Sequence, residues 1–251
     1  MQKDMSYNAL SRFYDAFNYD IDYKKIAKKI SGFMKNRPDS VVADLCCGTG
    51  GLSLELLKLG YDVISIDYNE KMLEAAGKKI GGYEKALLIK QDIRNLDLYG
   101  TVDIFVCLFD GINHLDSLKD VKKAFRCVDL FLHPDGKFIF DINTTLKFNT
   151  DFNNTVFCDE LDNCVMIWKN YYNKKNQKCD MELSFFEKDV EKYTRYDDHI
   201  TEKCFETEQI TQALNGCNLK VIKILDGDTF AEFNAGSKRA MFITEKITKN
   251  F

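Results

Sequence analysis

The sequence has little of several features that would set it apart from an ordinary globular enzyme. Only two prolines occur in 251 residues. No stretch approaches the roughly 20 consecutive apolar residues that a membrane-spanning helix needs. The first ten residues, MQKDMSYNAL, contain no apolar core of the kind found in secretory signals. We therefore expect neither export nor membrane insertion, and predict a soluble, cytoplasmic protein.

Cysteine is present, but not in a pattern that indicates disulfides or a metal site. The nine cysteines are an odd number, and no two are separated by the two-residue gap of a C-x-x-C pair. A structural zinc site normally shows such close pairs, and a disulfide framework is typical of short secreted chains. The sequence therefore predicts a reduced compartment and no bound metal.

An excess of positive charge is also lacking. Lysine and arginine number 35 against 39 aspartates and glutamates, a net charge of -4. A polynucleotide backbone is usually met by a clear basic surplus. Nucleic acid is therefore not the expected partner, and a monomer or a homodimer that binds a small molecule is expected instead.

Strand and helix patterns alternate over the first 143 residues. Glycine turns and β-branched runs mark the strands, and apolar residues three or four apart mark the helices. Such alternation implies a mostly parallel sheet of Rossmann-like type with helices on both faces. The expected strands are 40–44, 61–67, 85–93, 103–109 and 137–143, and the expected helices are 20–35, 52–60, 69–80 and 117–132.

The pattern changes after residue 143. Short strands are expected at 165–173, 179–187 and 191–205, which indicates an antiparallel β insert. A helix at 207–216 and strands at 219–225 and 239–247 then return to the sheet. We therefore assign 1–143 and 206–251 to one α/β domain and 144–205 to an insert that caps the substrate. Pro38 and Pro134, the latter in the segment HPDG, fall in predicted turns.

The loop after the first strand, DLCCGTGG, is the strongest indication of function. Gly48 and Gly50 allow a ligand to approach the backbone, and the next helix begins tightly behind them. Asp44 at the mouth of this loop would repel a pyrophosphate but attract an ammonium group, which suggests an amino-acid moiety. Asp67 ends the second strand, where an acid hydrogen-bonds ribose hydroxyls. The expected ligand is therefore both an amino acid and a nucleoside.

Four segments together carry a family resemblance: VVADLCCGTG, VISIDYNEKML, KQDIRNL and DIFVCLFDGINHL. They resemble the class I S-adenosylmethionine-dependent methyltransferases over residues 40–143. The resemblance implies that the glycine loop holds the methionine part, that Asp67 holds the ribose, and that S-adenosylmethionine is the cofactor. It implies the following cofactor-binding residues: Asp44, Cys46, Gly48, Gly50, Asp67, Tyr68, Met72, Gln91, Asp92, Ile93 and Leu108.

Three positions need separate comment: Cys46, Asp92 and a candidate catalytic residue, His114. Cys46 stands where the family pattern D-x-G-x-G-x-G has its first glycine, a departure that keeps a small side chain. Asp92 either recognises adenine or caps the next segment. His114, in GINHL, is either a catalytic base or a hydrogen-bonded structural histidine.

The N-terminal segment 7–23, YNALSRFYDAFNYDIDY, is rich in aromatic residues. Such clusters usually form core, but in sugar N-methyltransferases, which the chain resembles, a segment of this kind folds over the cofactor as a lid. On that resemblance Tyr14 is a catalytic and cofactor-binding residue and Tyr23 a further cofactor contact. Their ring faces would favour a sulfonium cation.

The predicted activity is transfer of a methyl group to a nitrogen or oxygen of a small polar metabolite. A nicotinamide oxidoreductase would show G-x-G-x-x-G, which this loop lacks. A non-catalytic cofactor-binding protein and an RNA or protein methyltransferase stay open as alternatives. Five aromatic residues of the insert either line the acceptor pocket or form the core of the insert: Trp168, Tyr171, Tyr172, Phe185 and Tyr196.

Overall fold

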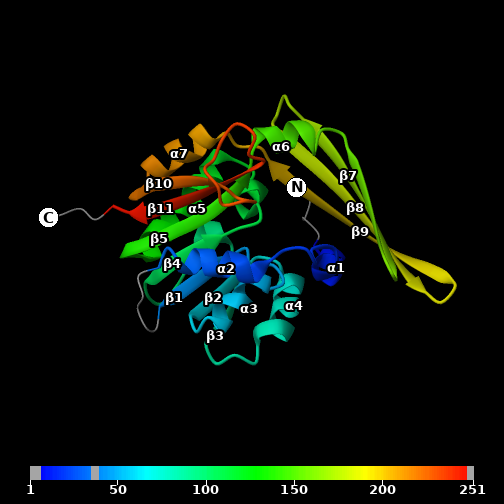
Figure 1. Ribbon diagram of the computed structural model, residues 1–251, viewed down its shortest axis with the longest axis horizontal. Coiled ribbons are helices and arrows are strands. Elements are labelled where there is room, and N and C mark those ends of the chain that lie inside the picture. Colours follow the sequence, from blue (N-terminus) through cyan, green and yellow to red (C-terminus); the bar gives the residue numbers. More distant parts are fainter. Residues whose placement is uncertain (1–6, 35–39, 248–251) are drawn as a thin grey trace.

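The predicted parallel strands form the centre of a seven-stranded sheet (Figure 1). The structure is a computed structural model that describes residues 7–34 and 40–247. All strands run parallel except β11, which pairs antiparallel with β5 on one side and β10 on the other. In spatial order the strands are β10 (Leu219–Asp226), β11 (Arg239–Lys246), β5 (Leu132–Asn143), β4 (Val102–Cys107), β1 (Val41–Leu45), β2 (Asp62–Asp67) and β3 (Ala86–Lys90).

Helices cover both faces of this sheet, as predicted. One core contains Phe105 of β4 and Phe138 of β5, together with α5 (Leu118–Phe131) and α7 (Thr207–Asn215). The opposite core contains Ile104 and Val106 of β4, together with α2 (Tyr23–Ser31), α3 (Gly51–Lys58) and α4 (Glu70–Ile80). Because neighbouring residues of a strand point to opposite faces, a continuous apolar strand such as β4 serves both cores. The Rossmann-like fold is therefore confirmed.

The segment HPDG differs from the prediction. It lies within β5 rather than in a turn, as a bulge between Leu132, which pairs with Val102, and Lys137, which pairs with Ile104. A side chain on Gly136 would come within 2.9 Å of the Asp103 carbonyl, so the bulge requires glycine there. Pro38 lies outside the described residues.

A second sheet, of four antiparallel strands, projects from the first (Figure 1). Its strands are β6 (Val156–Leu161), β7 (Cys164–Asn173), β8 (Lys178–Asp189) and β9 (Lys192–Lys203), preceded by the short helix α6 (Thr145–Thr150). The strands β7 and β8, of 10 and 12 residues, are longer than predicted, whereas β9, of 12 residues, is shorter than the predicted 191–205. The strand β6 was missed because its residues are almost all exposed and show no apolar alternation. The sheet lies within the predicted insert.

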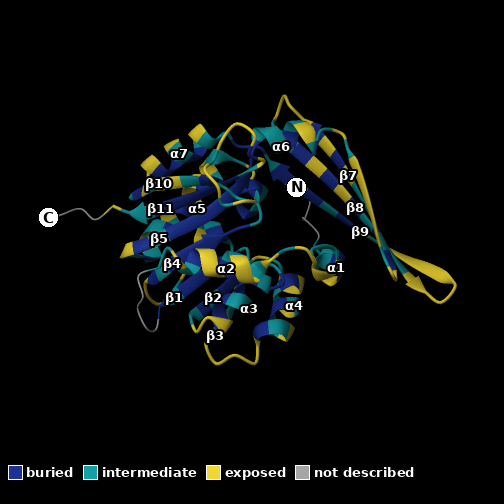
Figure 2. Ribbon diagram, in the orientation of Figure 1, coloured by how far each residue is buried: buried dark blue, intermediate teal, exposed yellow. Residues whose placement is uncertain are grey.

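One face of the small sheet is buried and the other is largely exposed, which Figure 2 shows as alternating bands along its strands. The buried face packs on α1 (Leu10–Phe17) and α6. Phe185 of β8 stacks on Phe13 of α1, with ring centroids 4.8 Å apart. This third core is formed by the N-terminal helix α1 together with residues of the insert, so the small sheet and α1 depend on each other.

Polar contacts hold α1 at both of its sides. Ala9 before the helix has no side-chain acceptor, and Asp198 of β9 supplies one instead, 2.6 Å from the Leu10 amide. On the other side, the Asp15 carboxylate accepts from the Thr49 hydroxyl at 2.6 Å and pairs with Lys79 at 2.8 Å. The single helix predicted for residues 20–35 is α2, and α1 was not separately predicted. The lid segment thus joins the small sheet to the glycine loop.

Candidate active site

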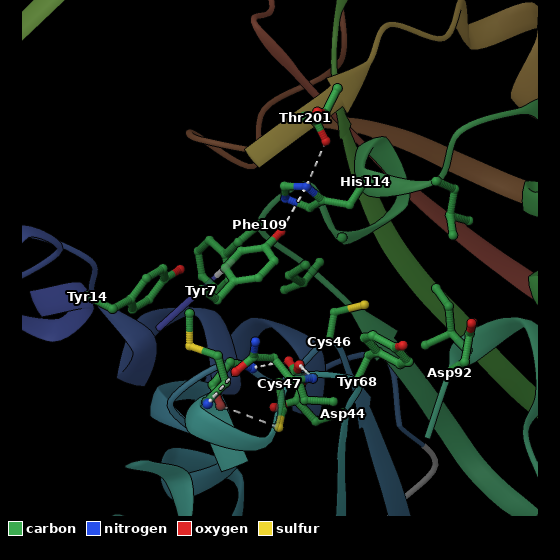
Figure 3. Close-up of a pocket in the computed structure, with 18 of the residues that line it drawn as sticks. Tyr7, Tyr14, Asp44, Cys46, Cys47, Tyr68, Asp92, Phe109, His114 and Thr201 are labelled. Atoms are coloured by element: carbon green, nitrogen blue, oxygen red, sulfur yellow. Dashed lines mark hydrogen bonds between the residues drawn. The ribbon is translucent and has the colours of Figure 1, made fainter. Parts of the chain in front are cut away.

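A cavity of about 550 Å³ opens at the carboxyl ends of β1, β2 and β4, and residues of α1 and of the small sheet complete its lining (Figure 3). The structure brings all but one of the predicted site residues into its lining. Gly50 is the exception. The predicted residues that line the cavity are Tyr14, Tyr23, Asp44, Cys46, Gly48, Asp67, Tyr68, Met72, Gln91, Asp92, Ile93, Leu108 and His114.

The glycine loop turns through three left-handed residues. Cys46, Gly48 and Gly50 have φ values of +55°, +54° and +77°. No atom lies within 4 Å of the place where a Gly48 side chain would begin, so the backbone there is open. A Cβ on Gly50 would meet the Ala76 Cβ at 3.1 Å, so this glycine allows α3 to approach α4. Gly50 therefore serves helix packing and does not line the cavity.

Cys46, which stands where the family pattern has a glycine, adopts a left-handed conformation, which usually favours glycine. Its thiol points between strand ends, toward Cys107 and Gly111. A Cβ on Gly111 would lie only 3.1 Å from the Cys46 sulfur, so the glycine at 111 makes room for the cysteine at 46. The hydrogen bond with Cys46, together with burial, raises the pKa of the Cys107 thiol. The departure from the family pattern is thus accommodated by packing.

Asp44 is a buried carboxyl at the floor of the cavity. Its Oδ2 accepts a hydrogen bond from the Ser53 hydroxyl at 2.6 Å, and Ser65 donates to Ser53 at 2.8 Å. Burial and the nearby Asp67 charge raise the pKa of Asp44 to about 7, although the hydrogen bond from Ser53 acts in the opposite direction. A cation placed in the cavity would stabilise its ionised form.

Asp67 fastens the glycine loop to the end of β2. Its two oxygens accept from the Gly48 amide at 2.9 Å and the Asn69 amide at 2.8 Å. Burial raises the pKa of Asp67 despite these bonds. Asp67 lines the cavity together with Tyr68, which is 72% exposed, and Met72, which is buried.

The segment after β3 forms the short 3₁₀ turn η1 (Ile93–Asn95). Asp92 caps this turn through the Arg94 amide at 2.8 Å and also binds the Arg94 guanidinium, at 2.5 Å for the shortest contact. Gln91 is held by the Asp97 backbone. The capping alternative for Asp92 is thus present in the structure, and adenine recognition by Asp92 stays a prediction.

Aromatic rings close the opposite end of the cavity. Tyr23 packs edge-on to Phe109, with centroids 5.5 Å apart, and hydrogen-bonds Tyr14. Any side chain on Gly51 would lie 2.6 Å from the Tyr23 ring, so glycine at the start of α3 lets this ring lie close over the helix. Burial raises the pKa of Tyr23 to about 12 and raises that of Tyr14 as well. Both hydroxyls are therefore neutral near pH 7.

His114 lies at the upper side of the cavity, at the end of the 3₁₀ turn η2 (Gly111–His114) (Figure 3). Its Nδ1 is 3.1 Å from the Tyr7 hydroxyl and 3.2 Å from the Thr201 carbonyl oxygen. Its Nε2 lies 3.8 Å from Asp110. The imidazole is therefore held by the lid segment on one side and by the small sheet on the other.

Comparison with known proteins agrees with this geometry. Residues 42–136 match the family model described as a methyltransferase domain. A crystal structure of an S-adenosylmethionine-dependent methyltransferase from Clostridium acetobutylicum ATCC 824 superposes with a TM-score of 0.83. It is 28% identical to this chain, over 96% of this chain and 98% of that one. This chain is an S-adenosylmethionine-dependent methyltransferase.

Two further similarities cover nearly the whole methyltransferase. A protein of Bacillus subtilis (strain 168) named "Putative methyltransferase YqeM" is 28% identical over 96% of this chain and 98% of its own length. The structure of CalS10, an amino pentose methyltransferase from Micromonospora echinaspora bound to S-adenosylmethionine, superposes with a TM-score of 0.75 at 17% identity. The superposition covers 98% of this chain and all of that one (100%). In the part of the methyltransferase that the structure describes, no helix is long and apolar enough to cross a membrane.

The small sheet of the methyltransferase contributes side chains to the cavity that the sequence patterns did not reveal. Of the two alternatives for the insert's aromatic residues, the pocket role is wrong, because none of the five lines the cavity. Phe185 and Tyr172 are buried in the third core, Trp168 and Tyr196 pack against it, and Tyr171 is 45% exposed. Polar residues of β8 and β9 line the cavity instead, namely Lys178, Asp180, His199 and Thr201. An alternating polar strand does not show in advance which of its faces meets a ligand.

Proposed function

We propose that this methyltransferase moves a methyl group from S-adenosylmethionine to a nitrogen or oxygen of a small polar metabolite. The observation that carries the proposal is the shape of the cavity. Its floor is the glycine loop with Asp44 and Asp67, and its upper side is a polar group of side chains around His114 and Thr201. A cavity roofed by α1 and a β-sheet suits a compact acceptor better than a polymer.

The residues at the floor fit the cofactor. The open backbone at Gly48 would lie beside the methionine carboxylate, and Asp44 beside its ammonium group. Asp67 would accept from the ribose hydroxyls, with Tyr68 and Met72 against the nucleoside. Gln91, Asp92 and Ile93 would border the adenine, and Leu108 would present its backbone near the ammonium group.

When bound, S-adenosylmethionine supplies an activated methyl group on a sulfonium and leaves as S-adenosylhomocysteine. The aromatic end formed by Tyr14, Tyr23 and Phe109 offers ring faces to a cation there. The main task of the protein is to hold the acceptor in line and to exclude water, since such transfer needs little acid-base chemistry. His114 is the side chain best placed to accept a proton from the acceptor.

The insert, residues 144–205, serves in this proposal as the substrate cap. Its strands β8 and β9 present Lys178, Asp180, His199 and Thr201 to the cavity. Acidic and basic groups stand side by side, with His199 3.7 Å from Asp180. Such a surface suits a polar metabolite with several hydrogen-bonding groups.

Calorimetry and a labelling experiment test the proposal. We expect binding heat with S-adenosylmethionine and S-adenosylhomocysteine and none with NAD. Methyl-labelled cofactor is then supplied to a whole-cell extract, and the products are fractionated by size. Label in the small-molecule fraction supports the proposal. Label only in RNA or protein would refute the acceptor class, and cofactor binding without any label would indicate a non-catalytic binding protein.

A further inference from the structure

Two carboxyl groups, one half-buried and one fully buried, lie close to His114 but outside the cavity lining. Asp110 precedes η2, and Glu202 comes from β9 of the small sheet, 92 residues later in the chain. Atoms of Asp110, His114 and Glu202 that could bind a proton all lie within 4.8 Å of one another. Neither carboxyl group has a role in the proposed binding of cofactor.

The Asp110 carboxylate is fixed rigidly in place. Phe109 and Asp110 are consecutive non-glycine residues with φ values of +59° and +62°. Their amides donate to the Asp141 carboxylate at 3.1 Å and 2.8 Å, and Arg239 binds both Asp110, at 3.1 Å, and Asp141, at 3.2 Å. Such strained backbone persists where its surroundings hold it, and it is often found at functional sites.

Glu202 is the least expected member of the group. It lies on the buried face of β9, only 2% exposed, among residues of the third core. Its Oε2 accepts from the Asn143 side chain at 2.8 Å, and it also hydrogen-bonds Asp110. Two adjacent carboxyl groups, one half-buried and one fully buried, cannot both ionise cheaply, so one of them holds a proton.

We infer that Asp110, Glu202 and His114 form a proton-accepting triad for the acceptor, which enters as a protonated amine, with Glu202 as a neutral positioning residue. The inference rests on the proposed function. His114 touches the acceptor, the Asp110 carboxylate stabilises the imidazolium that forms, and the Glu202 hydroxyl donates to Asp110 and fixes its orientation.

The proton passes from the acceptor to the imidazole in one step. An N–H bond of the acceptor ammonium breaks and an N–H bond forms at Nε2 of His114, whose Nδ1 is held by the Thr201 carbonyl. The electron pair stays on the acceptor nitrogen, which becomes a nucleophile. The imidazolium then returns its proton to solvent when the cavity opens, so one proton is released for each methyl group transferred.

The charges around the triad support this division of roles. Burial would raise the pKa of Asp110, but Arg239, Lys147 and His114 lower it overall, which keeps Asp110 ionised. Burial and the Asp110 charge raise the pKa of Glu202 well above its usual range, which keeps Glu202 protonated. The other titratable or charged groups that face the triad are Tyr7, Tyr14, Asp67, Asp141, Lys147, Cys179 and Arg239.

The test uses ¹³C-methyl S-adenosylmethionine and the small-molecule fraction of a whole-cell extract. Carbon NMR separates a methyl group on nitrogen from one on oxygen, so the acceptor need not be identified first. Initial rates are measured across about pH 6 to 9 for wild type, Asp110→Asn, Glu202→Gln and Glu202→Ala. Glu182→Gln, at an exposed position of β8, is the matched control.

We expect the label on nitrogen. Asp110→Asn should lower the rate near neutral pH by about tenfold or more, with a rate that rises steeply with pH because only acceptor that is already neutral reacts. Glu202→Gln should keep nearly the wild-type rate and pH profile, because an amide replaces a protonated carboxyl group well. Glu202→Ala should behave like Asp110→Asn, and the control should be unchanged.

Several results would overturn the inference while the proposed function stands. These are label on oxygen, a wild-type pH profile in Asp110→Asn, or a Glu202→Gln variant as slow as Glu202→Ala. Calorimetric binding of S-adenosylmethionine shows that each variant keeps its cofactor site. No label with the wild-type protein would overturn the proposed function and this inference together.

Discussion

The two sheets border the same cavity but bring side chains to it in different ways. In the parallel sheet, the contributions come from strand ends and from the loops after them, such as Asp44 and Asp67. In the small sheet they come from within strands, by alternation. Asp180 and Thr201 face the cavity as a cross-strand pair, and the next pair, Met181 and Ile200, lies in the third core.

In the parallel sheet, the carboxyl groups that line the cavity are therefore separate from the core residues. In the small sheet, cavity residues and core residues alternate along the same strands. A residue at a parallel strand end can change with little effect on the helices and strands behind it. A cavity residue of β8 or β9 alternates with buried residues of the strand, as Asp180 does with Cys179 and Met181. Because the small sheet also packs on α1, substitutions in the small sheet should affect both the free energy of unfolding and the lid segment.

The largest effect is expected from Phe185→Ala. This side chain is fully buried (0% exposed) and stacks on Phe13, so its removal leaves a cavity in the third core. We expect a loss of about 3 to 5 kcal/mol in the free energy of unfolding, measured by urea denaturation. Tyr171→Ala, on the exposed face of β7, should change it by less than about 0.5 kcal/mol. Equal effects would contradict the assignment of the two faces.

Asp67→Ala tests the role of a strand end of the parallel sheet in cofactor binding. We expect cofactor binding to weaken by about 1 to 3 kcal/mol in calorimetry, because ribose hydroxyls lose an acceptor and the Gly48 amide loses its partner. Asp62→Asn changes the same strand at its other end and should leave affinity unchanged. An unaltered dissociation constant in folded Asp67→Ala would show that the ribose assignment is wrong.

The pH dependence of cofactor affinity tests Asp44. With a pKa of about 7, its ionised fraction rises from about a tenth at pH 6 to about a half at pH 7. Affinity for a ligand with an ammonium group should therefore rise about fivefold over this range. Calorimetry at the two pH values measures the change, and Asp44→Asn should remove it. A pH-independent wild-type affinity would show that Asp44 does not meet the ammonium group.

Ionisation of Asp44, which strengthens cofactor binding, lowers the stability of the protein without cofactor. The folded-state pKa of Asp44 lies above its ordinary value of 3.8, so the folded state binds the proton more tightly than the unfolded state. Its contribution to stability is therefore present at low pH and is lost as the pH rises from about 4 to about 7. Urea denaturation without cofactor should show that this slope is absent in Asp44→Asn.

The smallest effect is expected from Asp15→Ala, which breaks the contact of α1 with Thr49 and Lys79. The carboxylate is 52% exposed, so the free energy of unfolding should fall by only about 0.5 kcal/mol. Hydrogen exchange should nevertheless speed up across α1. Asp20→Ala, an exposed acid of the same segment, is the control, and equal exchange in both variants would contradict the bridging role of Asp15.

The sequence by itself determined the parallel part of the fold and the floor of the cavity. Alternating strand and helix patterns are local, and parallel strands must present their carboxyl ends at one edge. Asp44, Gly48 and Asp67 could therefore be placed from the order of residues along the chain. The bulge in β5 and the strand β6 could not, because one depends on pairing with β4 and the other lacks an apolar face.

Only the tertiary structure decided what surrounds His114. Tyr7 lies 107 residues from His114 in the chain, and Asp198 caps a helix 188 residues away. The sequence could not show that Glu202 would lie close to Asp110, since a strand with alternating polar residues does not specify which face will be buried. The buried face is fixed when the small sheet packs on α1 and α6. Burial of the apolar face then places the Glu202 carboxyl group in the core, close to Asp110.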